Sequence, residues 1–405
     1  MKMSRFVCMP LLAVCQLSFK ENVMKAGNKT ARQYLSAEQL KAFGAEIEAL
    51  ERAVKESLGE KDEQYIRHIM RIHKRCEIAG RGLLFFGILP PAWLAGTALL
   101  GVAKILENME IGHNAMHGQW DWLEDASLKG STYEWDTTCP SDQWRHSHNY
   151  MHHTYTNIVG KDRDVGYGIL RMSEDQPWNP YYLLQPVWNF LLAIWFQWGV
   201  ALHDLEVEKV VAGEKSFKAM WQQLKAIGRK SGKQVLKDYV LFPALAGPFF
   251  LPVLLGNMGA NLIRNVWAYA IIFCGHFPDG VTMFSEEECQ NETKGEWYLR
   301  QLLGSCNIEG GRWFHIMSGH LSHQIEHHLF PDMPAYRYTE VSPKVREICE
   351  RYGLPYNTGS FFNKFGTVMR RVHRLALPGG KFNERALSQE LVKKAATVHK
   401  LSEAA

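Results

Sequence analysis

The chain has 405 residues and a formal net charge of +4, so it could hold two or three soluble domains or one membrane enzyme with a cytosolic cap. A charge this small for the length gives no support to nucleic-acid binding. The 8 cysteines are scattered without a CxxC pair, which argues against a disulfide framework or a zinc ribbon. The 13 tryptophans and 15 tyrosines are typical of a protein with aromatic rings at a membrane interface.

Residues 1–35 are expected to form an N-terminal extension. The opening MKMSRFVCMPLLAVCQLSFK has a short basic start and a weak apolar run, as in a signal peptide, but no clear cleavage site follows. We favour the alternative, an over-extended start with the true initiator at Met24. Residues 36–58 then place apolar side chains three or four positions apart, and Ser36 with Gln39 matches a capping box. This segment predicts an amphipathic helix packed on the rest of the protein.

Three apolar stretches, 82–103, 176–203 and 239–278, are long enough for a membrane-crossing helix, which needs roughly 20 residues. The first is interrupted by Pro90 and Pro91 and is expected to belong to spans near 78–111.

The third stretch, 239–278, is charged only at Arg264 and is about twice as long as one crossing requires. It should therefore cross twice. Gly256 and Gly259, with asparagines beside them, make a plausible turn between the two crossings.

The middle stretch is more polar and carries several tryptophans, which predicts an interfacial helix near 180–202. Residues 203–238 carry eight lysines or arginines, which indicates the cytosolic side. If the histidines on either side of 239–278 form one site, an even number of crossings must separate them. We therefore expect an all-α, multi-pass integral membrane protein with about four transmembrane helices, whose active site faces the cytosol.

Eleven of the 17 histidines lie in two short windows, residues 113–153 and 315–328. In the motif HNAMH, His113 and His117 are four positions apart, so both imidazoles share one face of a helix and can point at one metal ion. A single pair of this kind has an ordinary structural explanation just as often.

The second motif, HNYMHHTYTN, repeats the four-residue spacing with His148 and His152. The adjacent His153 would point about 100° away from His152 on a helix, towards a different centre.

The third motif, HQIEHHLFP, has the same arrangement in His323, His327 and His328. Together the three motifs supply eight imidazoles, enough for two metal ions, and three unrelated polar stripes would be a poor explanation. There is no HExxH motif, and eight ligands exceed what a zinc ion needs. Imidazole suits iron, copper and zinc, and two redox-capable ions at a membrane face favour iron, although spacing alone does not separate iron from zinc.

These motifs resemble the three histidine boxes of the membrane fatty-acid desaturase superfamily, and the resemblance covers roughly residues 60–375. The segments GVAKILENMEIGHNAMHGQWDW, DVGYGILR, RNVWAYAIIFCGHFPDG and LPYNTGSF look like bacterial acyl-CoA Δ9 desaturases of the actinobacterial type. The resemblance implies one desaturase domain over residues 36–375, followed by a tail at 376–405.

The resemblance also implies a set of iron ligands, including one at the end of the last membrane segment. These residues are His113, His117, His148, His152, His153, His276, His327 and His328. The remaining position is open between His323 and Gln324, because family members carry either HxxHH or QxxHH. We favour His323, since imidazole is the better ligand.

Further residues near the motifs either support a metal ligand or have no role in the site. His146 and His320 are two of these. The carboxylates of Glu110, Glu326 and Asp332 could accept the second ring N–H of a ligand and fix its tautomer, or could simply be solvated.

The activity implied by the resemblance is O₂-dependent insertion of a cis double bond into a saturated acyl chain, with two iron ions, acting on an acyl-CoA or an acyl-lipid. The tail motif LALPGGK has leucine where a fused cytochrome b5 domain has its haem histidine, and neither GxGxxG nor an iron–sulfur cysteine set is present. A separate ferredoxin-type or flavin-containing reductase is therefore implied. The alternatives are a di-iron membrane hydroxylase and, more distantly, a membrane metal transporter, which would carry ionisable ligands inside its spans.

Overall fold

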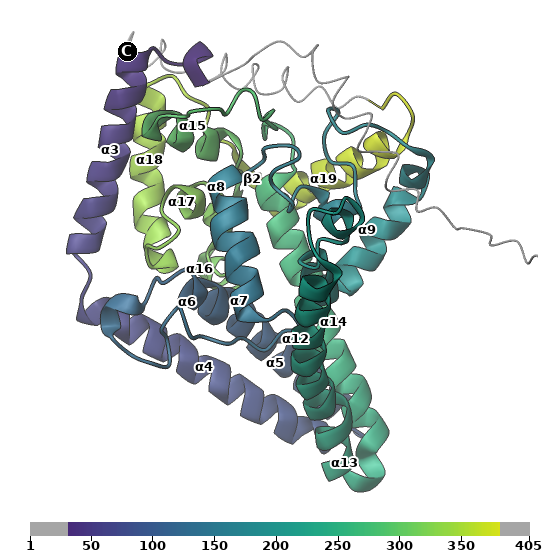
Figure 1. Ribbon diagram of the computed structural model, residues 1–405. Coiled ribbons are helices and arrows are strands. Elements are labelled where there is room, and N and C mark those ends of the chain that lie inside the picture. Colours follow the sequence, from purple (N-terminus) through teal and green to yellow (C-terminus); the bar gives the residue numbers. More distant parts are fainter. Residues whose placement is uncertain (1–30, 381–405) are drawn as a thin grey trace, which may run out of the picture.

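The computed structural model in Figure 1 describes residues 31–380. The expected initiator at Met24 and most of the expected N-terminal extension lie outside the described residues. So does the tail at 376–405, apart from its first five residues.

The described residues are mainly helical with very little strand, which confirms the all-α prediction. Within them, the only sheet is a parallel pair of short strands, β1 (Asn307–Glu309) and β2 (Thr358–Ser360). This pair ties the segment before α16 (Arg312–Met317) to the start of α19 (Phe361–Ala376).

The predicted amphipathic helix is α3 (Ala37–Glu56). Its capping box is present, because Gln39 N donates to Ser36 Oγ at 3.2 Å and Ser36 N donates to Gln39 Oε1 at 2.9 Å. The apolar face buries Phe43 and Ile47 against α15 (Lys294–Leu303) and α18 (Tyr338–Arg351). The helix thus lies on the outer side of the group formed by α3, α15 and α18, which we call the cap (Figure 1).

The first helical hairpin contains α4 (Glu60–Leu84) and α5 (Pro90–Ile105). Pro90 stands at the first position of α5, where its missing N–H leaves no helical bond unmade, so the two prolines begin a helix rather than break one. Gly80 lets the helices approach closely, since a Cβ there would lie 2.7 Å from Leu100 N. α5 continues as a π-helix, η3 (Leu106–His113), and as α6 (Asn114–Met116).

The first arm of the second hairpin consists of α12 (Phe217–Val235), the π-helix η8 (Leu236–Leu241) and α13 (Phe242–Leu245). It returns through one long helix, α14 (Phe250–His276), after the short turn η9 (Gly247–Phe249).

The turn expected at Gly256 and Gly259 is therefore wrong, because both residues lie inside α14. Gly247 makes the turn with a positive φ of 56°, a conformation that glycine adopts without strain. Gly256 serves close packing instead: a Cβ there would lie 2.4 Å from Leu84 Cδ2 of the first hairpin.

Among residues 31–380, no helix is at once long enough and apolar enough to pass through a membrane. The segment expected to form one interfacial helix near 180–202 is divided into η7 (Pro180–Leu184), α9 (Gln185–Ile194) and α10 (Phe196–His203), with a break at Trp195.

The helices that carry the histidines meet in the centre of the molecule, between the hairpins and the cap (Figure 1). Besides η3, which ends at His113, and α14, they are the π-helix η5 (Arg145–His152), α8 (His153–Tyr155), η10 (Leu321–His323) and α17 (Gln324–Leu329). His117 directly follows α6, and α7 (Ser141–Trp144) directly precedes η5. The remaining short elements are η2 (Ala31–Gln33), η4 (Asp121–Leu123), η6 (Gly166–Gly168), α11 (Val207–Val211) and η11 (Ala335–Arg337).

Candidate metal centre

Eight of the nine histidines expected as ligands lie together in the structure. Four separate segments supply them: the junction of η3 and α6, the junction of η5 and α8, the C-terminal end of α14, and α17. They are His113, His117, His148, His152, His153, His276, His327 and His328.

The rings divide into groups that could each hold a metal ion. In the largest, His113, His117, His148 and His327 offer nitrogen atoms that all lie within 4.8 Å of one another. A second group with the same spacing contains His152, His276 and His328, and a third joins His153 to His327 and His328. Two ions could therefore be held side by side, with His153 between the groups.

The four-residue repeat of His148 and His152 does not place them in the same histidine group. His148 lies with His113, whereas His152 lies with His276. The two rings still lie side by side on the π-helix η5, with centroids 5.0 Å apart, and each contributes to a different neighbouring group. His148 and His152 do meet in a mixed group with the carboxylate of Asp164.

The ring nitrogens fit a bound cation because many are buried without any other partner. Within residues 31–380, the Nε2 atoms of His113, His117, His148, His152 and His327 have no hydrogen-bond partner. The same holds for Nδ1 of His327 and for both ring nitrogens of His153. Buried polar atoms are almost always paired in folded proteins, so a cluster of unpaired nitrogens facing one another indicates a metal site.

Burial also keeps most of these imidazoles in the form that binds metals. Loss of solvation lowers the pKa of His113 to about 4 and lowers the pKa values of His117, His148 and His327 well below the ordinary range. Neutral imidazole has a free nitrogen lone pair at neutral pH, as metal coordination requires. For His152, burial opposes protonation, but Asp162 raises its pKa overall.

Hydrogen bonds to the second ring nitrogen orient several of the rings. His152 Nδ1 lies 3.1 and 3.0 Å from the two carboxylate oxygens of Asp162. His113 Nδ1 lies 3.0 Å from Asn114 Oδ1, and His328 Nδ1 lies 3.0 Å from Gln301 Oε1. Each contact fixes Nδ1 as the protonated nitrogen and leaves Nε2 for a metal ion.

The expectation that His323 completes the cluster needs correction. Its ring stacks on His315 at 4.6 Å between centroids, and its Nε2 lies 3.4 Å from Thr339 Oγ1. Gln324 lies at the cluster instead, with its Nε2 atom 2.9 Å from His276 Nε2. His323 belongs to the turn η10 and α17 begins at Gln324, so the four-residue spacing before His327 does not fall within one helix.

The carboxylates expected to support the ligands have other partners in the described chain. Glu110 Oε2 lies 2.9 Å from His320 Nδ1, and Glu110 Oε1 accepts from Tyr65 OH at 2.6 Å. Glu326 accepts hydrogen bonds from Tyr356 OH at 2.7 Å and from Asn307 Nδ2 at 2.8 Å. His320 thus lies beside the site without joining the cluster.

Two further candidates lie on the surface. His146 is exposed and stacks on Tyr150, and Asp332 pairs with Lys55 Nζ at 2.7 Å. The acceptor that the sequence did not reveal is Asp162, because it follows His152 by ten positions in a loop and no helical spacing connects the two residues.

A buried cavity adjoins the histidines. Its wall includes rings of His113, His148, His152, His276 and His327. Aromatic and aliphatic side chains make up much of the remainder, among them Trp135, Trp144, Tyr167, Phe196, Ala268 and Ile272. The indole of Trp144 stacks on His148 with ring centroids 4.4 Å apart. A largely apolar cavity therefore lies directly against a candidate two-metal centre.

Comparison with known proteins identifies the family of this chain. Residues 90–360 match the family model described as fatty acid desaturase. An NADPH-dependent stearoyl-CoA 9-desaturase of Mycobacterium tuberculosis is 48% identical over 357 residues, which cover 87% of this chain and 84% of the relative. An sn-1 linoleoyl-lipid 6-desaturase of Synechocystis is 27% identical over 283 residues, 68% of this chain and 77% of the relative. The chain therefore belongs to the fatty acid desaturase family.

Proposed function

We propose that this protein is an O₂-dependent acyl-CoA desaturase that introduces a cis double bond at position Δ9 of a saturated chain. The observation that carries the proposal is the cluster of eight histidines, all buried except the half-buried His148, most of them with unpaired ring nitrogens, beside a largely apolar cavity. The name of the mycobacterial relative supports stearoyl-CoA as the substrate.

The proposed cofactor is a pair of iron ions. His113, His117, His148 and His327 would hold one ion, and His152, His276 and His328 the other. When bound, two iron ions supply the activation of O₂ that removal of hydrogen from an unactivated CH₂–CH₂ unit requires. An all-imidazole donor set suits iron, and seven of the eight rings, all except His328, have a buried nitrogen without a hydrogen-bond partner in the described part of the chain.

The protein's own contribution is orientation and exclusion of water. Asp162, Asn114 and Gln301 hold three of the rings with Nε2 directed away from their own hydrogen bonds. Trp144 packs on His148 and forms part of the apolar wall, so a hydrocarbon chain beside the histidines is shielded from solvent.

We also propose that the protein is embedded in a membrane by its two hairpins, with the histidine cluster on the cytosolic side. Large apolar side chains are exposed around both hairpin tips. They include Phe86, Ile88, Leu89, Leu94, Leu241, Leu245, Leu251, Leu255 and Met258. An exposed apolar surface of this kind is typical of a membrane contact. His276 lies at the opposite end of α14 from this surface.

The segment α9 supports an interfacial contact. Its polar residues point inward, since Gln185 Nε2 donates to Val372 O and Tyr269 OH donates to Asn189 Oδ1. Phe190 is 62% exposed on the outer side, and Val187 is 50% exposed. A helix with its polar side towards the protein and its apolar side outward is suited to lie against lipid.

Electrons would come from a separate ferredoxin-type or flavin-containing reductase. The dependence of the mycobacterial relative on NADPH supports a donor chain that begins with this nucleotide. The sequence itself holds no dinucleotide-binding fingerprint.

The test is expression in a host that lacks desaturases, together with a reductase, followed by fatty-acid profiling. The protein should produce a Δ9 cis-monounsaturated acid, and His327→Ala should abolish it while His146→Ala, at an exposed position outside the cluster, should not. An alcohol in place of an alkene would show a hydroxylase and overturn the proposal. Retained activity in His327→Ala would overturn the assignment of the site.

A further inference from the structure

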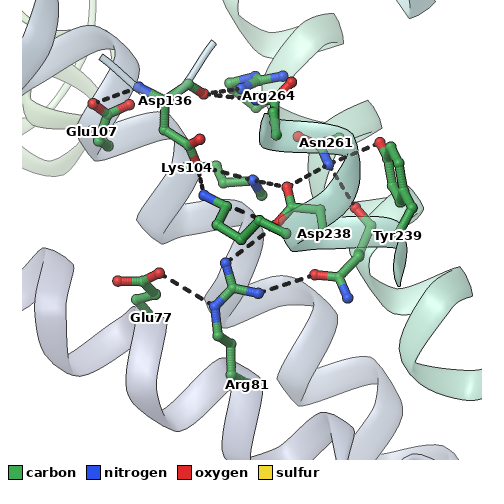
Figure 2. Close-up of polar contacts among 12 residues, drawn as sticks. Glu77, Arg81, Lys104, Glu107, Asp136, Asp238, Tyr239, Asn261 and Arg264 are labelled. Carbon is green, nitrogen blue, oxygen red and sulfur yellow. Dashed lines mark hydrogen bonds and ion pairs between the residues drawn. The ribbon is translucent and has the colours of Figure 1, made fainter. Parts of the chain in front are cut away.

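A network of basic and acidic side chains lies between the two hairpins (Figure 2). Its members are Glu77, Arg81, Lys104, Glu107, Asp136, Lys237, Asp238 and Arg264. At its centre the fully buried Asp238 accepts from Arg81 Nη2 at 3.2 Å and from Lys104 Nζ at 2.7 Å.

The network meets the cavity at Arg264. The guanidinium is only 1% exposed and lines the cavity beside Asn265. Its Nη1 donates to Asp136 O at 3.0 Å and its Nη2 donates to Asn265 Oδ1 at 3.1 Å. Asp136 N in turn donates to Glu107 Oε1 at 2.9 Å. Arg264 is therefore held in place on the cavity wall from several directions.

The cavity runs along α14, with the histidines at one end and Arg264 at the other. Ala268, Ile272 and His276 of α14 line it at helical spacing after Arg264. Twelve residues separate Arg264 from His276, which corresponds to roughly 18 Å along the helix axis.

The residues of helix α10 line the cavity in the same order, from the Arg264 end to the metal centre. His203 lines it near the metal centre, since its Nε2 lies 3.8 Å from Asp164, which belongs to the mixed group with two of the clustered histidines. Gln197 lines it six residues earlier, about 1.7 helical turns, and accepts from Thr138 Oγ1 through its backbone oxygen at 2.7 Å. Asn265 Nδ2 donates to the oxygen of Ile194, the last residue of α9, at 2.9 Å, so the chain just before α10 lies beside the Arg264 end.

The character of the wall changes at that end. Ala268 and Ile272 are apolar, whereas Arg264, Asn265 and Gln197 are polar. Within residues 31–380, the buried Gln197 Oε1 has no hydrogen-bond partner, and neither does Oγ1 of the cavity-lining Thr137. A hydrocarbon chain cannot pair with such atoms and would displace any water that does, which makes its further advance unfavourable.

We propose that Arg264, held by Asp136 and Asn265, forms a polar end plate that fixes the longest acyl chain the enzyme accepts. This inference rests on the proposed function, because it requires an acyl chain in the cavity. The methyl end of the substrate lies against Ala268, and Arg264 stops it there. Arg264 is a specificity-determining residue in this account and takes no part in the chemistry.

The decisive variant is Ala268→Leu, which shortens the apolar part of the cavity and leaves the ion-pair network intact. The readout is the ratio of initial rates with stearoyl-CoA and with myristoyl-CoA, measured on the iron-loaded protein with its reductase. The ratio should fall at least about tenfold, since one methylene of misfit in an apolar pocket changes specificity about 10–200-fold. Ala270→Leu is the matched control, because Ala270 is buried on the same helix but does not line the cavity, and it should leave the ratio unchanged.

A second variant, Arg264→Met, removes the end plate and should raise the rate with behenoyl-CoA relative to stearoyl-CoA. Arg264→Lys should leave the ratio of these two rates as in the wild type. An unchanged ratio in an active Ala268→Leu protein would overturn the inference. An equal loss of rate with stearoyl-CoA and myristoyl-CoA in folded, iron-loaded Ala268→Leu protein would also overturn it. The cavity wall at Ala268 would then contact a part of the substrate that both acyl chains share. Wild-type protein inactive on every chain length would refute the proposed function instead.

Discussion

Replacement of Asp162 by asparagine tests how the second ring nitrogen of a ligand controls metal binding. Both carboxylate oxygens lie within 3.1 Å of His152 Nδ1. The same carboxylate accepts backbone N–H bonds from Asn157 at 2.8 Å and from Asp164 at 3.0 Å, so its position is fixed by three donors. An amide of the same shape offers one acceptor and would turn its NH₂ group towards a donor. Loss of such a partner weakens metal binding about 10–100-fold, which corresponds to about 1.4–2.8 kcal/mol.

The assay is chelator competition on the purified, iron-loaded protein, with bound iron measured against chelator concentration. In Asp162→Asn, the iron held by the group that contains His152 should be lost at about 10–100-fold lower chelator concentration, while the iron held with His113 is retained longer. Asp332→Asn is the control, because this exposed carboxylate contacts Lys55 on the surface. Identical titration curves for Asp162→Asn and wild type would refute the reasoning.

Three further changes test the packing and the electrostatics. Trp144→Ala should lower the free energy of unfolding, measured by urea denaturation, by about 3–5 kcal/mol. Trp313→Ala, at a position 66% exposed, should change it by no more than about 0.5 kcal/mol. Asp238→Asn removes the buried carboxylate that Arg81 and Lys104 share, so that their remaining ion pairs are the longer ones with Glu77 at 3.3 Å and Asp136 at 3.4 Å. It should cost about 3–5 kcal/mol, against at most about 1 kcal/mol for Glu77→Gln; similar losses would contradict this account. Burial raises the pKa of Glu326 to about 7, so the folded protein retains a proton that the unfolded chain releases near pH ~4. Stability should therefore fall as the pH rises between these values, and thermal unfolding of Glu326→Gln should lack this decrease.

The helical fold and most of the histidine cluster could be predicted from the sequence because both depend on short-range spacing. Eight of the nine expected rings lie together, and the capping box at Ser36 is present as predicted. Only one arm of each hairpin follows from the long apolar stretches: α5 and α14 lie in them, whereas α4 and α12 are charged along their length. The turn of the second hairpin was also missed, because Gly256 resembles a turn residue in the sequence but serves helix packing against Leu84 in the structure.

The details that sequence analysis missed depend on departures from α-helical geometry. The rings of His148 and His152 lie side by side on the π-helix η5 but belong to different histidine groups, and the turn η10 directs His323 away from the cluster. A four-residue spacing predicts a shared face only where the α-helix is continuous. Asp162 could not be assigned because a loop, and no helical spacing, brings it to His152. Arg264 could not be assigned because its role comes from a contact with Asp136, far away along the chain.

The central claim is that the eight clustered histidines hold two iron ions. Quantitative metal analysis of the purified protein, in parallel with His327→Ala and His146→Ala, tests it most directly. Two iron ions per chain are expected in the wild type and in His146→Ala, with a clear loss of iron in His327→Ala. Zinc in place of iron, or an unchanged iron content in His327→Ala, would contradict the account.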